Sequence, residues 1–289
     1  MPIRNPSEWG GDQLGRAAVA VGAVVGAIHR PEEDMHAPPA VRRIGVAALK
    51  SALAAGFRDF AACRTDVIVL CFLYPIIGLV LARLVVGQGM FELMFPVASG
   101  FALIGPFIGI GLYEMSRQRE LGREVSWAAT FDVLRSPSTG AIALLGLVLL
   151  AAFLAWLYAA QSIYDMTLGP HHPASWGRFA QDVFTTERGW TLIGLGMGVG
   201  FVFALVVFAI SAVSFPLLLD RSDVGVVTAV GTSIRALAAN PGTMALWGLI
   251  VAGSLAIGSI PFFVGLAVVI PVLGHATWHL YRQLVVPHG

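Results

Sequence analysis

Two histidines near the carboxyl end of the chain have a type and spacing that could support chemistry. His275 and His279 lie four positions apart in "VLGHATWHLYRQ", residues 272–283, and residues at this spacing share one face of a helix. Neutral imidazoles so placed can ligate a haem iron or another metal. The alternative is an interfacial belt, because Trp278 and Arg282 beside them combine apolar bodies with polar tips.

The remaining ionisable residues favour the interfacial interpretation of this pair. A haem–copper oxidase centre needs histidines on several helices, but the other five lie outside every predicted span: His29, His36, His171, His172 and His288. No carboxylate is predicted at the middle of the membrane, which argues against a proton pump built on buried acids. We therefore expect no cofactor and no catalytic residue, and keep haem or metal binding by His275 and His279 as an alternative.

The composition places most of the chain in a membrane. Of 289 residues, 57% are hydrophobic and only 12% are charged, which is too apolar for a soluble globule. The net charge of +1 gives no basic footprint for nucleic acid. Cys63 and Cys71 lie eight apart and lack the C-x-x-C spacing of a zinc or redox pair.

Hydrophobic runs predict an all-α, polytopic fold with six transmembrane helices. About twenty apolar residues cross a bilayer, and such windows fall near 67–86, 93–113, 141–160, 190–212 and in a double-length block, 243–281. Gly258 and Pro261 are expected to divide that block into two spans. Residues 1–40 are expected to form a poorly ordered tail, residues 41–284 the transmembrane domain, and residues 161–189 an extracytoplasmic loop with a short interfacial helix.

The basic residues predict the orientation. Fifteen of the 18 fall in segments on one side of the predicted spans, and only Arg83, Arg178 and Arg188 on the other. The positive-inside rule then puts both termini in the cytoplasm.

An amphipathic stretch precedes each pair of predicted spans, at 46–64, 125–135 and 226–239. Their apolar faces are predicted at Leu49, Leu53, Phe57 and Phe60; at Trp127, Phe131 and Leu134; and at Val227, Val230, Ile234 and Leu237. "PFIGIGLYEMSRQ" (106–118) and "PVLGHATWHLYRQ" (271–283) also share Pro, Gly, an aromatic residue, Arg and Gln in register. We infer three pseudo-repeats of an interfacial helix and a hairpin, roughly 44–120, 125–222 and 225–284.

Small residues and aromatic or basic anchors complete the pattern. GxxxG spacing predicts helix packing, inside the bundle first and at an oligomer or partner-subunit interface second, at Gly105, Gly109, Gly194, Gly196, Gly198 and Gly200. Interfacial anchors are predicted at Tyr113, Arg117, Trp176, Trp278 and Arg282.

The order "GFRDF", "GFALIGPFIGIGLYEMSRQRELG", "FTTERGW", "SFPLLLDR" and "PVLGHATWHLYR" resembles a bacterial family of predicted integral membrane proteins with a shared domain of unknown function. Some members of that family are catalogued as candidate cytochrome c oxidase subunits. The resemblance covers most of residues 40–284 and implies a bacterial inner-membrane location. It implies no established activity and carries no catalytic residues.

Three functions are compatible with these patterns. The first is a non-catalytic accessory, assembly or scaffold component of a membrane complex, with the lipid bilayer and either a second copy or other membrane subunits as partners. The second is a carrier or lipid-handling protein whose pseudo-repeats frame a cavity. The third is a redox component with haem or metal on His275 and His279.

Overall fold

The computed structural model describes residues 38–63, 76–81, 83–103, 105–123, 125, 136–169, 173–260 and 264–286. The part of the chain described is helical apart from short connections. Its elements are α2 (Val46–Ala62), η1 (Phe91–Leu93), α4 (Met94–Leu103), α5 (Gly105–Ile108), α6 (Ile110–Glu120), α8 (Thr139–Thr167), α9 (Trp176–Thr185), α10 (Glu187–Ser211), α11 (Ser214–Asp220), α12 (Val226–Ala239), α13 (Pro241–Ser259) and α14 (Leu266–Leu284).

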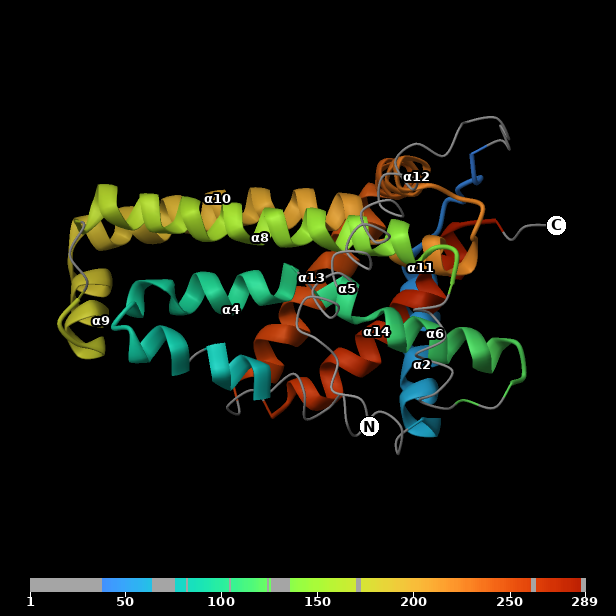
Figure 1. Ribbon diagram of the computed structural model, residues 1–289, viewed down its shortest axis with the longest axis horizontal. Coiled ribbons are helices and arrows are strands. Elements are labelled where there is room, and N and C mark those ends of the chain that lie inside the picture. Colours follow the sequence, from blue (N-terminus) through green and yellow to red (C-terminus); the bar gives the residue numbers. More distant parts are fainter. Residues whose placement is uncertain are drawn as a thin grey trace, which may run out of the picture.

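A long antiparallel hairpin of α8 and α10 sets the long axis of the molecule (Figure 1). Both helices are apolar and free of proline, so nothing interrupts their backbone hydrogen bonds. At 1.5 Å per residue, the 29 residues of α8 extend about 43 Å, enough to cross a bilayer with its headgroups. The short helix α9 connects them at one end, where Ser175 Oγ caps it by accepting from the Arg178 amide at 3.3 Å.

The described residues hold three helices long and apolar enough to cross a membrane, rather than the six predicted. They are Thr139–Thr167, the continuous run Glu187–Asp220, and Pro241–Ser259. A fourth arises if the pair Phe91–Gly100 and Gly105–Glu120, bent by 42° near Pro106, is one broken span.

The structure bears differently on the first and the last of the predicted spans. Half of 67–86 lies outside the described residues, as does Pro261. The last predicted span coincides with α14, which is not among the candidate spans. Its second half contains His275, His279 and Arg282, so its apolar character is confined to its first half.

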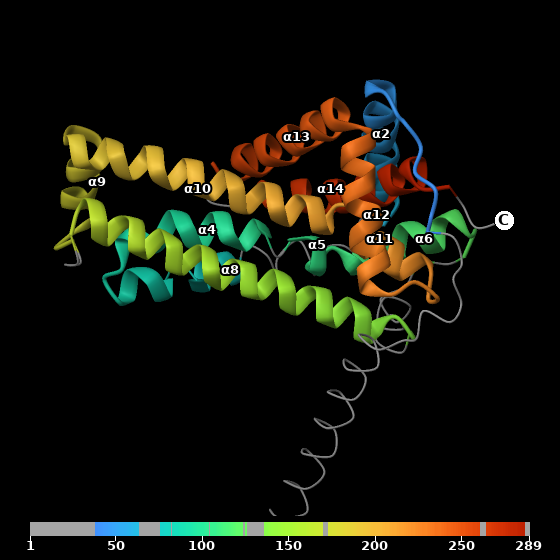
Figure 2. The same cartoon turned by 90° about the horizontal axis from the view of Figure 1, so that it is seen from above.

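Two of the three predicted amphipathic helices are present, as α2 and α12. Both lie at the end of the hairpin away from α9 and run across its axis (Figures 1 and 2). Their buried faces consist mainly of small residues: Leu49, Ala52, Gly56 and Asp59 in α2, and Ala229, Thr232, Ser233 and Ala236 in α12. Most of the third stretch, 125–135, lies outside the described residues.

Several large apolar residues of these helices lie at the surface, although Leu49 is in the core. Phe57 is 59% exposed, Val227 83% and Ile234 47%. A soluble protein would bury this face, but in a bilayer it can face lipid while the small-residue face allows close backbone packing.

The protein core lies at the same end. Its largest buried side chains come from α8, α11, α13 and α14, and include Leu145, Phe215, Trp247, Trp278 and Tyr281.

Two segments far apart in the sequence meet beside this core. Val41 and Val285 form an antiparallel bridge, and the Arg42 amide donates to the Leu284 carbonyl at 2.8 Å. Asn240, between α12 and α13, accepts from the Ile44 amide at 2.7 Å. Residues 40–44 and 284–286 therefore lie on the same side of the bundle.

Candidate functional site

A layer of polar residues crosses the interior at the α2 end of the molecule. It is built where α6 and α14 contact each other and where α2 crosses α14 (Figures 1 and 2). Helices α6 and α14 contain most of the two stretches that share Pro, Gly, an aromatic residue, Arg and Gln in register, residues 106–118 and 271–283, so these two stretches meet in space. Close packing at small residues makes the crossing tight, since Gly56 of α2 faces Ala276 of α14.

Asp59 is the centre of the polar layer. The residue is only 6% exposed. Its Oδ2 accepts a hydrogen bond from Ser116 Oγ at 2.7 Å and lies 2.7 Å from His279 Nε2, while Arg119 Nε is 3.0 Å from its Oδ1. One carboxylate thus joins α2 to both α6 and α14.

The surroundings of Asp59 keep it ionised. Burial would raise the pKa of this carboxyl, but the hydrogen bonds from His279 and Ser116, together with the positive charge nearby, outweigh burial and hold the pKa below its usual 3.8. Because Arg119 and His279 surround the carboxylate, its negative charge is paired rather than stranded in the interior.

His275 is more deeply buried than Asp59, with no exposed surface. Its Nδ1 lies 2.8 Å from Ser116 Oγ. The single hydroxyl proton of Ser116 goes to the ionised Asp59, so Ser116 Oγ accepts from a protonated Nδ1 and His275 is the Nδ1–H tautomer. Its Nε2 then carries a lone pair, buried and without a hydrogen-bond partner.

A second set of ion pairs lies beside this cluster and links α6, α11 and α14. Asp220 Oδ2 accepts from Tyr281 Oη at 2.7 Å and from Arg282 Nη1 at 3.3 Å. Glu120 accepts from Trp278 Nε1 and Arg282 Nε, both at 2.9 Å. Arg117 pairs with Glu114 at 3.1 Å. In both sets, side chains on one helix pair with side chains on another.

The arrangement of Asp59, Ser116 and His275 is not that of an activated nucleophile. In a catalytic triad the serine donates its proton to the histidine, and the carboxylate orients that histidine from its other side. Here Ser116 donates to the carboxylate and accepts from the histidine. The hydroxyl proton of Ser116 therefore points away from His275, so the histidine is not placed to act as its general base.

The histidine pair is engaged within the protein. His275 Nδ1 faces Ser116 and His279 Nε2 faces Asp59. Among the residues that the structure describes, no group of three or more His, Cys, Asp or Glu side chains is arranged to hold a metal ion. His171, His172 and His288 lie outside the described residues.

The predicted anchors fall in three environments. Tyr113 and Trp278 lie inside the protein, 3% and 1% exposed. Arg117 and Arg282 lie in the ion-pair network. Trp176 is half exposed on α9, at the opposite end, where its ring contacts Phe91 and Phe179.

The predicted packing glycines also differ from one another. A Cβ atom at Gly200 would lie 3.0 Å from the Trp156 ring, and one at Gly109 2.9 Å from the Tyr113 hydroxyl. Cβ atoms at the remaining four would meet nothing within 4 Å: Gly105, Gly194, Gly196 and Gly198. The last three lie along one stretch of α10, which therefore has room for another helix to approach.

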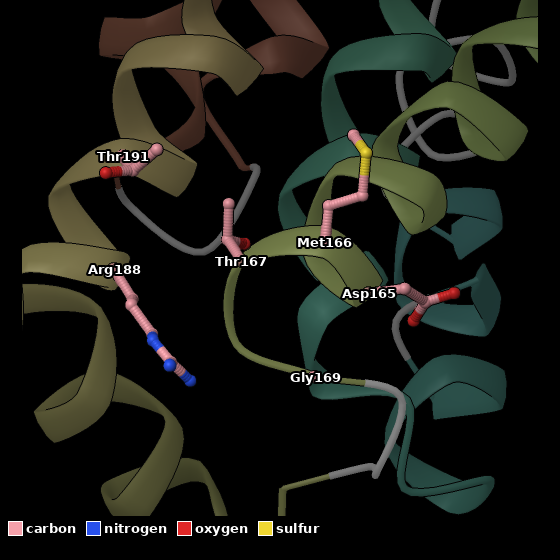
Figure 3. A pocket seen from close by; sticks show the side chains of 6 residues that line it. All are labelled: Asp165, Met166, Thr167, Gly169, Arg188 and Thr191. Carbon is pink, nitrogen blue, oxygen red and sulfur yellow. The ribbon is translucent and has the colours of Figure 1, made fainter.

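A pocket of about 290 Å³ opens at the far end of the hairpin (Figure 3). Its lining residues are Asp165, Met166, Thr167, Gly169, Arg188 and Thr191, which come from the end of α8, the turn after it and the start of α10. The pocket thus lies at the end of the spans and away from their midpoints.

Sequence reasoning missed Asp59, Ser116, Glu120 and the partner role of Asp220. One signal was available: Asp59 continues the small-residue series Ala52 and Gly56 at helical spacing. An acid on such a face is expected to meet a cation on the helix that packs there.

Comparison with known protein families gives a match for the middle of the chain. Residues 94–220 match the model of a family described as "Predicted integral membrane protein (DUF2189)". This segment runs from α4 to α11 and includes Ser116, Glu120 and Asp220. No curated protein and no solved structure matches the chain, and nothing in these comparisons supports a link to cytochrome c oxidase. The family match and the candidate spans agree that the chain is a multi-pass integral membrane protein, similar in residues 94–220 to the DUF2189 family.

Proposed function

We propose that this protein is a non-catalytic accessory or scaffold component of a larger membrane complex. The main observation behind this proposal is the contrast between the α2 end of the molecule, where helices are tied together, and the membrane spans, which are largely uncovered. Helices from distant parts of the chain are joined at the α2 end by partly buried ion pairs, whereas the spans leave much of their surface uncovered. Only 17% of the apolar window of α13 and 33% of that of α8 are buried within the chain.

The glycine face of α10 supports a protein partner on part of that surface. Gly194 and Gly198 are one helical turn apart, and both would accept a Cβ without meeting any atom within 4 Å. Small residues at this spacing let two helices approach closely in lipid, where packing supplies the attraction. We place the partner subunit, or a second copy, on this face. A respiratory complex is one such assembly, on the family resemblance alone.

For the topology we propose six crossings of a bacterial inner membrane with both ends in the cytoplasm. The distribution of the basic residues supports this orientation, and the contact between Val41 and Val285 supports a shared side for the two ends. Fluorescent-protein and alkaline-phosphatase fusions after residue 289 test it. We expect the fluorescent-protein fusion to be fluorescent and the phosphatase fusion to be inactive. A dark fluorescent-protein fusion with an active phosphatase fusion would contradict the orientation.

Site-specific photo-cross-linking in cells tests the partner face. A photoreactive residue at Gly198 is expected to give a discrete protein adduct, because a helix packs there. The matched probe at Tyr158, which is 79% exposed on α8, is expected to give lipid adducts. Adducts with lipid alone at both positions, together with a partner-free monomer after mild solubilisation, would contradict the proposal.

The buried Nε2 of His275 is the one observation that favours the redox alternative. The hydrogen bonds of His275 Nδ1 and of His279 Nε2 favour a structural role instead. An absorbance spectrum of protein purified from its own membrane separates the two. A haem band lost in His275→Asn would establish the redox alternative in place of the scaffold.

A further inference from the structure

We propose that the outward face of α2 binds the headgroups of anionic phospholipids. The inference is independent of any protein partner of the spans. The surface of α2 has three sectors: one faces the protein, one is apolar and uncovered, and one is basic.

The first sector faces the protein. Leu49, Ala52, Gly56 and Asp59 are buried at a spacing of three or four residues. A Cβ at Gly56 would lie 2.5 Å from the Ala276 amide nitrogen, and Asp59 is tied to His279 and Arg119. Backbone contact and ion pairing together fix the rotation of α2 about its own axis.

The second sector is apolar and uncovered. Val46 is 50% exposed and Phe57 59% exposed. Helical spacing puts these two residues on one face, eleven positions apart, and Leu53 and Phe60 lie between that face and the buried one. Because α2 runs across the hairpin axis (Figures 1 and 2), this strip lies along the plane of the membrane.

The third sector is basic. Lys50 and Arg58 are exposed on the other flank of the apolar strip, and Arg42 and Arg43 are exposed just before the helix begins. None of these four side chains pairs with a carboxylate in the described part of the chain, whereas Arg117, Arg119, Arg178 and Arg282 all do. The only acid of α2, Asp59, is in the buried sector.

A lipid headgroup matches these features better than an acidic protein. Phe57 can enter the acyl region while Lys50 and Arg58 remain at the depth of the phosphates, and guanidinium groups bind phosphate oxygens in a bidentate manner. An anionic lipid such as phosphatidylglycerol supplies both the acyl chains and the charged phosphate in one molecule. Phosphatidylcholine supplies the same acyl chains without net charge, so the face should discriminate between these lipids.

The test measures lipid binding to the full-length protein in detergent by native mass spectrometry, with phosphatidylglycerol and phosphatidylcholine compared at equal concentration. Wild type is expected to prefer phosphatidylglycerol, and the preference should weaken at high salt. The double variant Lys50→Gln, Arg58→Gln should bind phosphatidylglycerol roughly tenfold or more weakly, since each basic residue at an anionic surface contributes a several-fold factor. The charge-preserving pair Lys50→Arg, Arg58→Lys should keep the preference.

The matched control removes two cations from the opposite end of the molecule, as Arg178→Gln with Arg188→Gln, and should leave the preference unchanged. Wild type with equal affinity for both lipids would overturn the proposal. So would a Lys50, Arg58 double variant that retains the preference with an unchanged melting temperature. Loss of a co-purified acidic protein instead of lipid would assign the face to that protein and overturn the proposal as well.

Discussion

At the residue scale, Asp59 shows how a membrane protein can keep a charge inside by pairing it with groups from neighbouring helices. The carboxylate is buried, but it has a hydroxyl, an imidazole and a guanidinium within 3.0 Å. Each of these groups comes from another helix, so the energy that keeps the charge buried also holds α2, α6 and α14 together. A buried charge without such partners would be neutralised.

Replacement of Asp59 by Asn tests this role. Asp59→Asn leaves Arg119 without its counter-charge and His279 Nε2 without its carboxylate partner, and we expect the free energy of unfolding to fall by about 2–3 kcal/mol, because breaking a largely buried ion pair strands its partner. Reversible unfolding in detergent measures this. The matched variant Asp182→Asn breaks an exposed i,i+4 pair with Arg178 and should cost less than about 0.5 kcal/mol. Equal losses in the two variants would contradict the role of Asp59.

The pH dependence follows from the same carboxylate. Since the pKa of Asp59 in the folded protein lies below 3.8, the folded state binds this proton less readily than the unfolded state. Its contribution to stability is therefore complete well above pH 3.8 and is lost as the pH falls through the folded pKa. Unfolding measured from pH 6 to pH 3 should show a steeper loss in wild type than in Asp59→Asn. Parallel curves would show that the carboxylate is not selectively stabilised.

At the element scale, the amphipathic helices show what sequence could predict and why the rest was missed. Their positions as α2 and α12 follow from apolar spacing. The contact face followed only in part: Leu49 of the predicted apolar face lies in the core, but Phe57, Val227 and Ile234 are exposed, and small residues make up most of the buried face. In a bilayer, lipid can cover Phe57 and Val227, while helix contact requires the short side chains of Ala52 and Gly56.

The helix crossing can be tested at its closest contact. Gly56→Ala should destabilise the protein by about 1–3 kcal/mol, because its Cβ would meet backbone atoms of α14 that cannot move aside easily. Gly198→Ala adds the same methyl group to open space on α10 and should be neutral or stabilising by about 0.5–1 kcal/mol in the isolated chain. Thermal unfolding of the two purified variants compares them. A Gly56→Ala protein as stable as Gly198→Ala would mean that α2 does not pack closely on α14.

At the scale of the whole molecule, hydropathy predicted an all-helical membrane protein, and the family match and the described spans agree with this. Six equal crossings do not follow from the described helices. Hydropathy averages over a whole apolar block, but only the first half of α14 is apolar. Its second half contains His275 and His279, which belong to the polar layer. That layer depends on contacts between α2, α6 and α14, whose residues lie up to 220 positions apart. Local spacing can mark the buried face of α2, but it cannot identify the partners on the other two helices.

The partner face gives a prediction for the assembled molecule. Gly194→Leu with Gly198→Leu fills the open stretch of α10, where a Cβ atom at either position meets no atom of the same chain within 4 Å. We therefore expect the purified variant to fold and melt like wild type but to lose its partner, as measured by the yield of the co-purified subunit. Leucine at two exposed positions of α8, Ala155 and Tyr158, is the matched control and should leave that yield unchanged.

The most direct test of the scaffold assignment is to measure the mass of the protein complex extracted from its native membrane. Native mass spectrometry of the tagged full-length chain, released from native membrane vesicles in a mild detergent, gives that mass without assumptions about the partner. We predict a discrete assembly heavier than the 30.6 kDa chain, with a second polypeptide or copy in fixed stoichiometry that the Gly194, Gly198 double variant loses. A partner-free monomer for wild type, with only lipid bound, would contradict the account.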